Sequence, residues 1–115
     1  MALLQNLISL VILTDGTVAL AKAHGSITTK DHRITDFPKM ASVSSSQAVK
    51  SAMNKVNGQL VSIGLETENG YLVYAVEIVN PKTGLHEVNI DAGTAKIVSD
   101  HRKDRADSTL TKEHD

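Results

Sequence analysis

Residues 60–92 read LVSIGLETENGYLVYAVEIVNPKTGLHEVNIDA, and this stretch decides the fold. Apolar and polar residues alternate over most of it, a period of two that is typical of strands with one buried face. We therefore predict strands at 60–68, 71–79 and 85–92. Asn69-Gly70 favours a type I′ hairpin between the first two strands, because both residues tolerate a positive φ. Asn80-Pro81-Lys82-Thr83-Gly84 supplies the next turn, and connections this short require antiparallel neighbours.

One amphipathic helix precedes these strands. Its apolar residues fall on a single stripe with helical spacing: Ala48, Val49, Ala52, Met53 and Val56. The hydroxyl groups of Ser44-Ser45-Ser46 are suited to cap the helix N-terminus, and Gly58 is suited to end the helix in a left-handed conformation. We predict a helix over 46–56 whose apolar stripe packs on one face of the sheet.

The chain after the third strand completes the sheet and then changes in composition. Gly93-Thr94 indicates a second tight turn, followed by a short strand at 95–98. The predicted fold class is therefore α+β, with one amphipathic helix packed on a three- to four-stranded antiparallel meander. Residues 99–115 hold four Lys or Arg and five Asp or Glu. We predict a domain over 44–99 and a charged, disordered tail over 100–115.

This order of elements resembles the PepSY domain family, a small module found in propeptides of thermolysin-type metalloproteases and in many exported bacterial proteins. The resemblance covers residues 45–99, roughly half of the chain. It rests on an alanine-rich helix that ends at a glycine, a Leu-Glu strand, a tyrosine-centred strand and a strand that ends in Asp-Ala. In this sequence they are Ala48, Ala52, Gly58, Leu65-Glu66, Tyr74-Ala75-Val76 and Val88-Asn89-Ile90-Asp91-Ala92.

One position departs from the family pattern, which places glycine where this sequence has Ala95. Alanine adopts a positive φ only at an energetic cost. We therefore predict that Gly93 carries the turn instead of Ala95. The register of the last hairpin depends on which of these two residues takes the left-handed conformation.

The resemblance implies a binding role and no chemistry of its own. PepSY modules in propeptides are associated with inhibiting a cognate protease and assisting its folding, and separate copies are thought to regulate partners outside the cytoplasm. It therefore implies a non-catalytic extracytoplasmic protein-binding module, with a secreted peptidase or an envelope protein as its partner. Two alternatives stay open: a structural module that self-associates into a homo-oligomer, and a sensor of a small ligand or a metal.

The sheet face opposite the helix is the predicted partner-binding surface. By strand parity it presents Tyr71, Val73 and Ala75. An exposed apolar patch of this kind usually contacts a partner protein, a second copy or a cover from the same chain. Residues 24–43 are expected to be a linker or such a cover. The free edge of the sheet is a second candidate, since it can accept an extended peptide as an added strand.

The N-terminal segment 1–23 is predicted to be a cleaved signal peptide. It ends in two A-x-A triplets, 19–21 and 21–23, after a short apolar run at 7–13. Asp15 interrupts the apolar segment, and no Lys or Arg lies between Met1 and Asp15. The alternative to a signal peptide is therefore that this segment forms core strands or a short helix. Asp15 also argues against a stable membrane span. If the segment is removed, the protein is periplasmic or secreted.

The composition gives no support for catalysis or for a cofactor. The chain has 12 Lys plus Arg, 13 Asp plus Glu and no Cys, which favours neither nucleic-acid binding nor a thiol-based site. Its five histidines lack metal-ligand spacing. His86 stands beside Glu87, but neighbours in a strand point to opposite faces. No nucleophile elbow or phosphate-binding glycine loop occurs, so we expect no enzyme activity, no cofactor and no bound metal.

Overall fold

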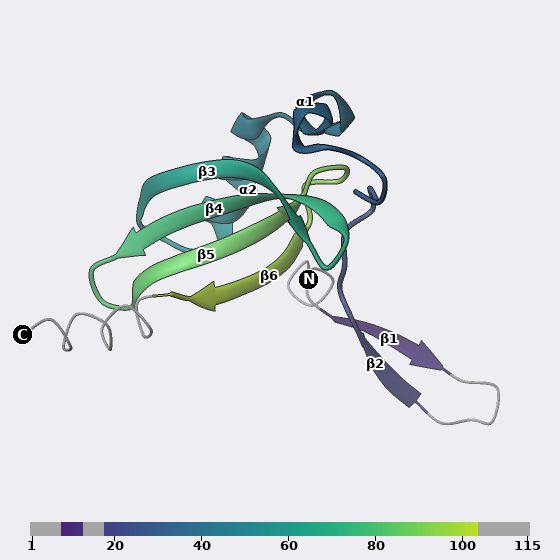
Figure 1. Ribbon diagram of the computed structural model, residues 1–115. Helices are drawn as coiled ribbons and strands as arrows, with labels where there is room; N and C mark the ends of the chain where they lie inside the picture. The colour runs from purple at the N-terminus through teal and green to yellow at the C-terminus, as the bar shows by residue number, and fades with distance from the viewer. Residues whose placement is uncertain (1–7, 13–17, 104–115) are drawn as a thin grey trace, which may run out of the picture.

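The computed structural model of the chain describes residues 8–12 and 18–103. A four-stranded antiparallel sheet with helices against one face follows a two-stranded hairpin (Figure 1). The α+β class predicted from the sequence is confirmed. The elements are β1 (Ile8–Ile12), β2 (Val18–Lys22), η2 (Ile34–Asp36), α1 (Phe37–Met40), α2 (Ser45–Lys55), β3 (Gln59–Glu68), β4 (Tyr71–Asn80), β5 (Gly84–Asp91) and β6 (Ile97–Arg102).

The strands β3 to β6 form a meander in which each strand pairs with the next one in the sequence. The turn between β3 and β4 has Asn69 at φ 52° and Gly70 at φ 86°, the two positive values that a type I′ turn requires. Between β4 and β5, the side-chain oxygen of Asn80 accepts the N–H of Lys82 at 2.7 Å and that of Thr83 at 3.0 Å. Both turns predicted from the sequence are confirmed.

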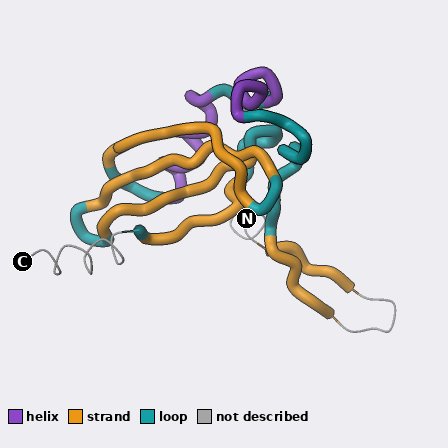
Figure 2. The backbone as a smooth tube through the Cα atoms, viewed as in Figure 1, coloured by secondary structure: helices purple, strands orange, loops and turns teal. Residues whose placement is uncertain are grey.

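The helix α2 is the one that the apolar stripe predicts, displaced by one residue toward the N-terminus. The Ser44 hydroxyl oxygen accepts the N–H of Gln47 at 3.1 Å, and the Gln47 side chain accepts the N–H of Ser44 at 3.0 Å. This reciprocal capping box fixes the start of the helix. Ala48 and Ala52 are fully buried where α2 contacts β4 and β5, and Figure 2 shows the helix behind the sheet.

The segment 24–43, predicted as a linker or as a cover of the face opposite the helix, also contributes to the core on the helix side of the sheet. Phe37, in the short helix α1, and Val43, before α2, are buried in the same cluster as the apolar residues of β4 and β5. The Tyr74 hydroxyl donates to the Val43 carbonyl oxygen at 2.7 Å, so a core strand holds the segment in place. A helix of one turn has too few residues for an apolar period, which is why the sequence pattern gave no sign of it.

The N-terminal strands β1 and β2 pair with each other as an antiparallel hairpin, with Ile8 opposite Lys22 and Ile12 opposite Val18. They form a two-stranded sheet separate from the meander (Figure 1). The residues between the strands and those before β1 lie outside the described part of the chain. The signal peptide remains a prediction.

The last hairpin differs from its prediction in both its strand and its turn. The strand β6 starts two residues later than predicted and continues to Arg102, into the segment predicted as a tail, whose residues from 104 onward lie outside the described part. Ala95 takes the left-handed conformation at φ 69°, so the prediction that Gly93 carries the turn is wrong. Gly93 provides space instead, because a Cβ there would lie 2.2 Å from the Ser26 hydroxyl oxygen.

Replacing Ala95 with glycine is expected to stabilise the protein. A left-handed alanine costs about 1–2 kcal/mol, and the added freedom of glycine in the unfolded chain offsets part of that gain. We expect the free energy of unfolding, measured by urea denaturation, to rise by roughly 0.5–1 kcal/mol. Ala41, at φ −68°, is the matched control, where the same substitution should lower it. An Ala95→Gly protein less stable than the wild type would contradict the assigned turn.

Candidate functional site

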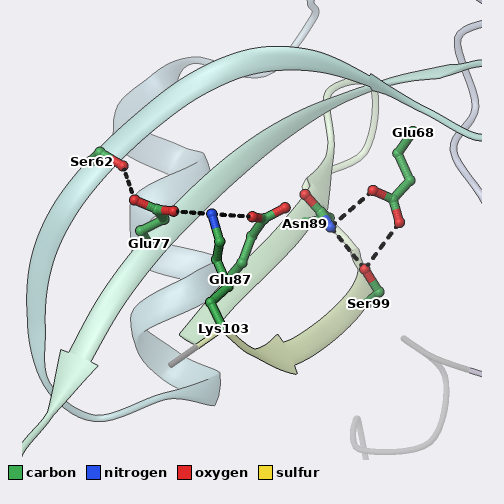
Figure 3. A network of polar contacts seen from close by, with 7 residues as sticks. All are labelled: Ser62, Glu68, Glu77, Glu87, Asn89, Ser99 and Lys103. Atoms are coloured by element: carbon green, nitrogen blue, oxygen red, sulfur yellow. Dashed lines mark hydrogen bonds and ion pairs between the residues drawn. The ribbon is translucent and has the colours of Figure 1, made fainter. Parts of the chain in front are cut away.

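The candidate site is the sheet face opposite α2, which we call the open face. Strand register places on it alternate residues of all four strands, followed by Lys103 at the end of β6. In Figure 3 the labelled side chains of this face lie in front of the sheet and α2 lies behind it. The residues that matter here are Ser62, Gly64, Glu66, Glu68, Tyr71, Val73, Ala75, Glu77, Glu87, Asn89, Asp91, Ser99 and Lys103.

Tyr71, Val73 and Ala75 share this face, as their parity predicts. Tyr71 is half-buried and its ring stacks on His24, with 4.8 Å between the ring centroids. Val73 is 1% exposed and Ala75 is 6% exposed. The expectation of an exposed apolar patch at these two residues is therefore wrong.

A polar contact explains why Val73 is buried. Glu68 and Asn89 belong to the strands on either side of β4. Their side chains meet across β4, where Asn89 Nδ2 donates to Glu68 Oε1 at 3.1 Å and to Ser99 Oγ at 2.9 Å (Figure 3). The other amide atom, Asn89 Oδ1, is buried and accepts no hydrogen bond from any described residue.

A second polar network lies further along the same strands. Glu77 and Glu87 stand directly opposite each other on β4 and β5. The Lys103 ammonium donates to Glu77 Oε2 at 2.6 Å and lies 3.3 Å from Glu87 Oε1, and Ser62 Oγ donates to Glu77 Oε1 at 2.7 Å (Figure 3). The hydrogen bonds from Lys103 and then Ser62 lower the pKa of Glu77, and those to Glu77 and Glu87 raise the pKa of Lys103.

A hollow of about 300 Å³ opens beside the second network. Gly64, which has no side chain, and Ala75, which has only a methyl group, line it, and a Cβ built on Gly64 would meet no atom within 4 Å. The acidic side chains of Glu66, Glu77 and Glu87 line it together with the single ammonium of Lys103; Ser62 and Ile63 complete the lining. The open face is thus hollowed and acidic, where the sequence predicted it to be apolar.

No sequence pattern singled out Glu77, Glu87 or Lys103 as members of this site. One signal for them exists, because the predicted register places Glu77 and Glu87 on neighbouring strands of one face. Two carboxylates directly opposite each other destabilise a sheet unless a cation lies between them. The basic residues at the end of β6 and just after it, Arg102 and Lys103, are one source of such a cation.

Exposed apolar side chains gather at the free edge instead. Leu60 is 43% exposed and Val61 is 55% exposed on the edge strand β3, where the register shifts at a bulge. A shallow groove of about 420 Å³ runs beside them between Gly58, Gln59, Val79 and Pro81. Leu60, Val61 and Val79 are the exposed large apolar side chains of the described part of the sheet.

Residues 8–12 and 18–103 contain no group of three or more His, Cys, Asp or Glu side chains that is suited to hold a metal ion. His86 lies on the face of Val88 and Ile90. Its Nε2 atom is 2.8 Å from Thr83 Oγ1 and its Nδ1 atom is 3.3 Å from Asp100 Oδ1. No helix among the described residues is long and apolar enough to cross a membrane.

Asp91 links Ser26, in the segment before the helices, to the turn between β5 and β6 through hydrogen bonds. Its carboxylate is 3% exposed and accepts the Ser26 N–H at 3.0 Å, the Ser26 hydroxyl at 2.8 Å, the Thr94 hydroxyl at 2.6 Å and the Gly93 N–H at 3.3 Å. Burial by itself raises the pKa of Asp91, but the four donors together outweigh burial and hold the pKa below its ordinary value. The folded protein therefore favours the charged carboxylate.

Protonation of Asp91 is expected to lower the free energy of unfolding at acidic pH. Its pKa is lower in the folded protein than in the unfolded chain, where it is about 3.9. Its contribution is therefore fully present above that value and is lost as the pH falls through the folded pKa. Asp91→Asn should lower the free energy of unfolding at neutral pH by roughly 1–3 kcal/mol and weaken its decline below about pH 4.

Urea denaturation over a series of pH values measures both effects. The exposed Asp31, at φ 65°, is the matched control, because asparagine tolerates that conformation. Asp31→Asn should follow the wild type. Equal stability of Asp91→Asn and the wild type at neutral pH would be evidence against the role given to this carboxylate.

Comparison with known proteins places most of this sheet and helix in one family. The model of the PepSY family, described as "Peptidase propeptide and YPEB domain", matches residues 42–101. Among solved structures, a "putative lipoprotein" from Clostridium difficile 630 is similar in fold, with a TM-score of 0.50 at 13% sequence identity. The likeness covers 76% of this chain and 57% of that one, so this chain spans little more than half of that protein. A search of the curated proteins found no match.

Proposed function

This chain belongs to the PepSY family, and on that premise we propose that it is a non-catalytic protein-binding module that regulates a peptidase outside the cytoplasm. The family model describes a peptidase propeptide domain, which favours a peptidase as the partner over other envelope proteins. The solved structure of similar fold is described as a lipoprotein, a class of protein found outside the cytoplasm. The location is periplasmic or secreted.

The open face is the observation that carries this proposal. The helices α1 and α2 pack against one side of the sheet, and the other side is hollowed over Gly64 and Ala75. In a two-layer fold, the face of the sheet that no helix covers is where a second protein can add a layer. We assign the partner contact to this face.

The three residues proposed for the contact have different parts in it. Ala75 lines the hollow, so its small side chain makes room for a side chain of the partner. Tyr71 offers an aromatic ring at the end of the face, where its stacking on His24 restricts it before binding. Val73 lies beneath the contact of Glu68 with Asn89 and supports the face from below.

The second candidate function is self-association through the edge strand β3. The exposed Leu60 and Val61 favour it, since an apolar edge strand can pair with the same strand of a second copy. Sedimentation at several protein concentrations separates the two functions, because only self-association changes the mass without a partner.

A leucine at position 64 is the sharpest test of the open face. It would enter empty space on the sheet, so we expect Gly64→Leu to fold at least as stably as the wild type. The wild type is expected to slow peptide cleavage by thermolysin, a protease of the class whose propeptides carry this domain. Gly64→Leu should lose that inhibition, measured as the rate of cleavage of a fluorogenic peptide.

Ser46→Leu is the control, because it adds the same side chain at an exposed position of α2. It should inhibit as the wild type does. A folded Gly64→Leu protein that still inhibits thermolysin would show that the open face is not the partner contact. Thermolysin that is not slowed by the wild type would contradict regulation of this class of peptidase.

Export is proposed through cleavage after Ala21 or Ala23. The contacts of His24 with Tyr71 and of Ser26 with Asp91 begin just after this point, so removal of the preceding residues keeps them. Expression with the native N-terminus in a bacterium should yield a periplasmic or secreted product whose intact mass begins at Lys22 or His24. Ala21→Phe should block cleavage at both triplets, since it belongs to both, whereas Ala21→Ser should not. A full-length cytoplasmic product would contradict export.

A further inference from the structure

We propose that the hollow on the open face binds a basic side chain, lysine or arginine, from the docking segment of the partner. This inference rests on the proposed function and names the chemistry of the partner at the same face. The occupant is thus a protein segment with a cationic side chain at its centre.

The charge of the hollow is the first argument. Three carboxylates, Glu66, Glu77 and Glu87, line it against one ammonium, that of Lys103, which leaves an excess of two negative charges. Glu66 is exposed, and no described residue forms an ion pair or hydrogen bond with its side chain. A concave surface of one sign attracts groups of the opposite sign more strongly than a flat one does.

The fit of an ammonium group is the second argument. Lys103 Nζ already lies 2.6 Å from Glu77 and 3.3 Å from Glu87, so these carboxylates are oriented to receive a cation. The small residues Gly64 and Ala75 leave the adjacent space open. A long, flexible basic side chain can lay its methylene groups over these small residues while its charge reaches the carboxylates.

Asn89 supplies an independent observation. Its side chain is 1% exposed and its Oδ1 atom accepts no hydrogen bond from the described residues, although buried acceptors of this kind nearly always have a donor. Figure 3 shows this oxygen turned away from Glu68 and Ser99, toward the side of Glu87. Asn89 is not itself part of the lining, but it stands opposite Ala75 and two residues from Glu87, which both line the hollow. A basic side chain brings several N–H donors and no acceptor, which is the complement of this arrangement.

The test uses the full chain, labelled with nitrogen-15, and two short peptides. The probe is acetyl-Gly-Lys-Gly-amide, and acetyl-Gly-norleucine-Gly-amide is its neutral control of similar shape. The lysine peptide should shift the amide signals of Gly64 and Ala75 in a saturable way that weakens as salt is added. The norleucine peptide should leave them unchanged.

Variants of the lining residues sharpen the test. Glu66→Gln and Glu87→Gln should each weaken binding of the lysine peptide roughly two- to fivefold, and Asp31→Asn, which removes one charge outside the lining, should not. Lys103→Met should tighten binding, because it removes the cation that competes for Glu77 and Glu87. Glu66 is exposed and unpaired, so its variant keeps the test valid if another variant fails to fold.

Equal shifts from both peptides, or binding that Glu66→Gln and Glu87→Gln leave unchanged, would overturn the inference. The two proposals fail in different ways. If Gly64→Leu abolishes thermolysin inhibition and the two glutamine variants do not affect it, the open face is the docking site, but the inference that it binds a basic side chain is wrong. If Gly64→Leu still inhibits, the docking site itself is wrong.

Discussion

The close packing of α2 on the sheet is the constraint on which the rest of the structure depends. Ala48 and Ala52 have no exposed surface, and side chains this small let the helix backbone approach β4 and β5. Gly58 does not take the left-handed conformation predicted for it. A Cβ there would lie 2.2 Å from the Val79 carbonyl oxygen, so the close approach to β4 is what requires glycine at the end of the helix. Because the helices bury one face of the sheet, the other face is free to carry polar and charged residues.

Electrostatics then organises the open face. Glu77 and Glu87 are neighbours across two strands, and their like charges would weaken the pairing without the ammonium of Lys103. That lysine reaches them because its own N–H donates to the Leu85 carbonyl oxygen at 2.8 Å, just past the end of β6. A sheet that ended at residue 98 would leave the two carboxylates without this cation. The charge balance of the open face therefore depends on the length of the last strand.

Local signals in the sequence predicted the elements whose conformation depends on neighbouring residues. Asn69-Gly70 takes the type I′ turn and Ser44 caps α2 with Gln47, since both effects act within four residues. Gly93 was predicted wrongly to carry the turn, because the reason for a glycine there is a distant contact. Ser26, 65 residues before Asp91, fills the space beside Gly93 and bonds to that carboxylate. The turn itself is closed locally, where the Ala95 N–H donates to the Asp91 carbonyl oxygen at 2.9 Å.

The sequence by itself determined the α+β class, the meander, the place of α2 and the face shared by Tyr71, Val73 and Ala75, because alternation and helical spacing are properties of short stretches. Only the tertiary structure decided what that face exposes. Glu68 and Asn89 reach across β4 to bury Val73, and Lys103 crosses β5 to join Glu77. Which neighbours a long polar side chain covers depends on the strand register and on its hydrogen-bond partners. The alternation of apolar and polar residues predicts neither of these.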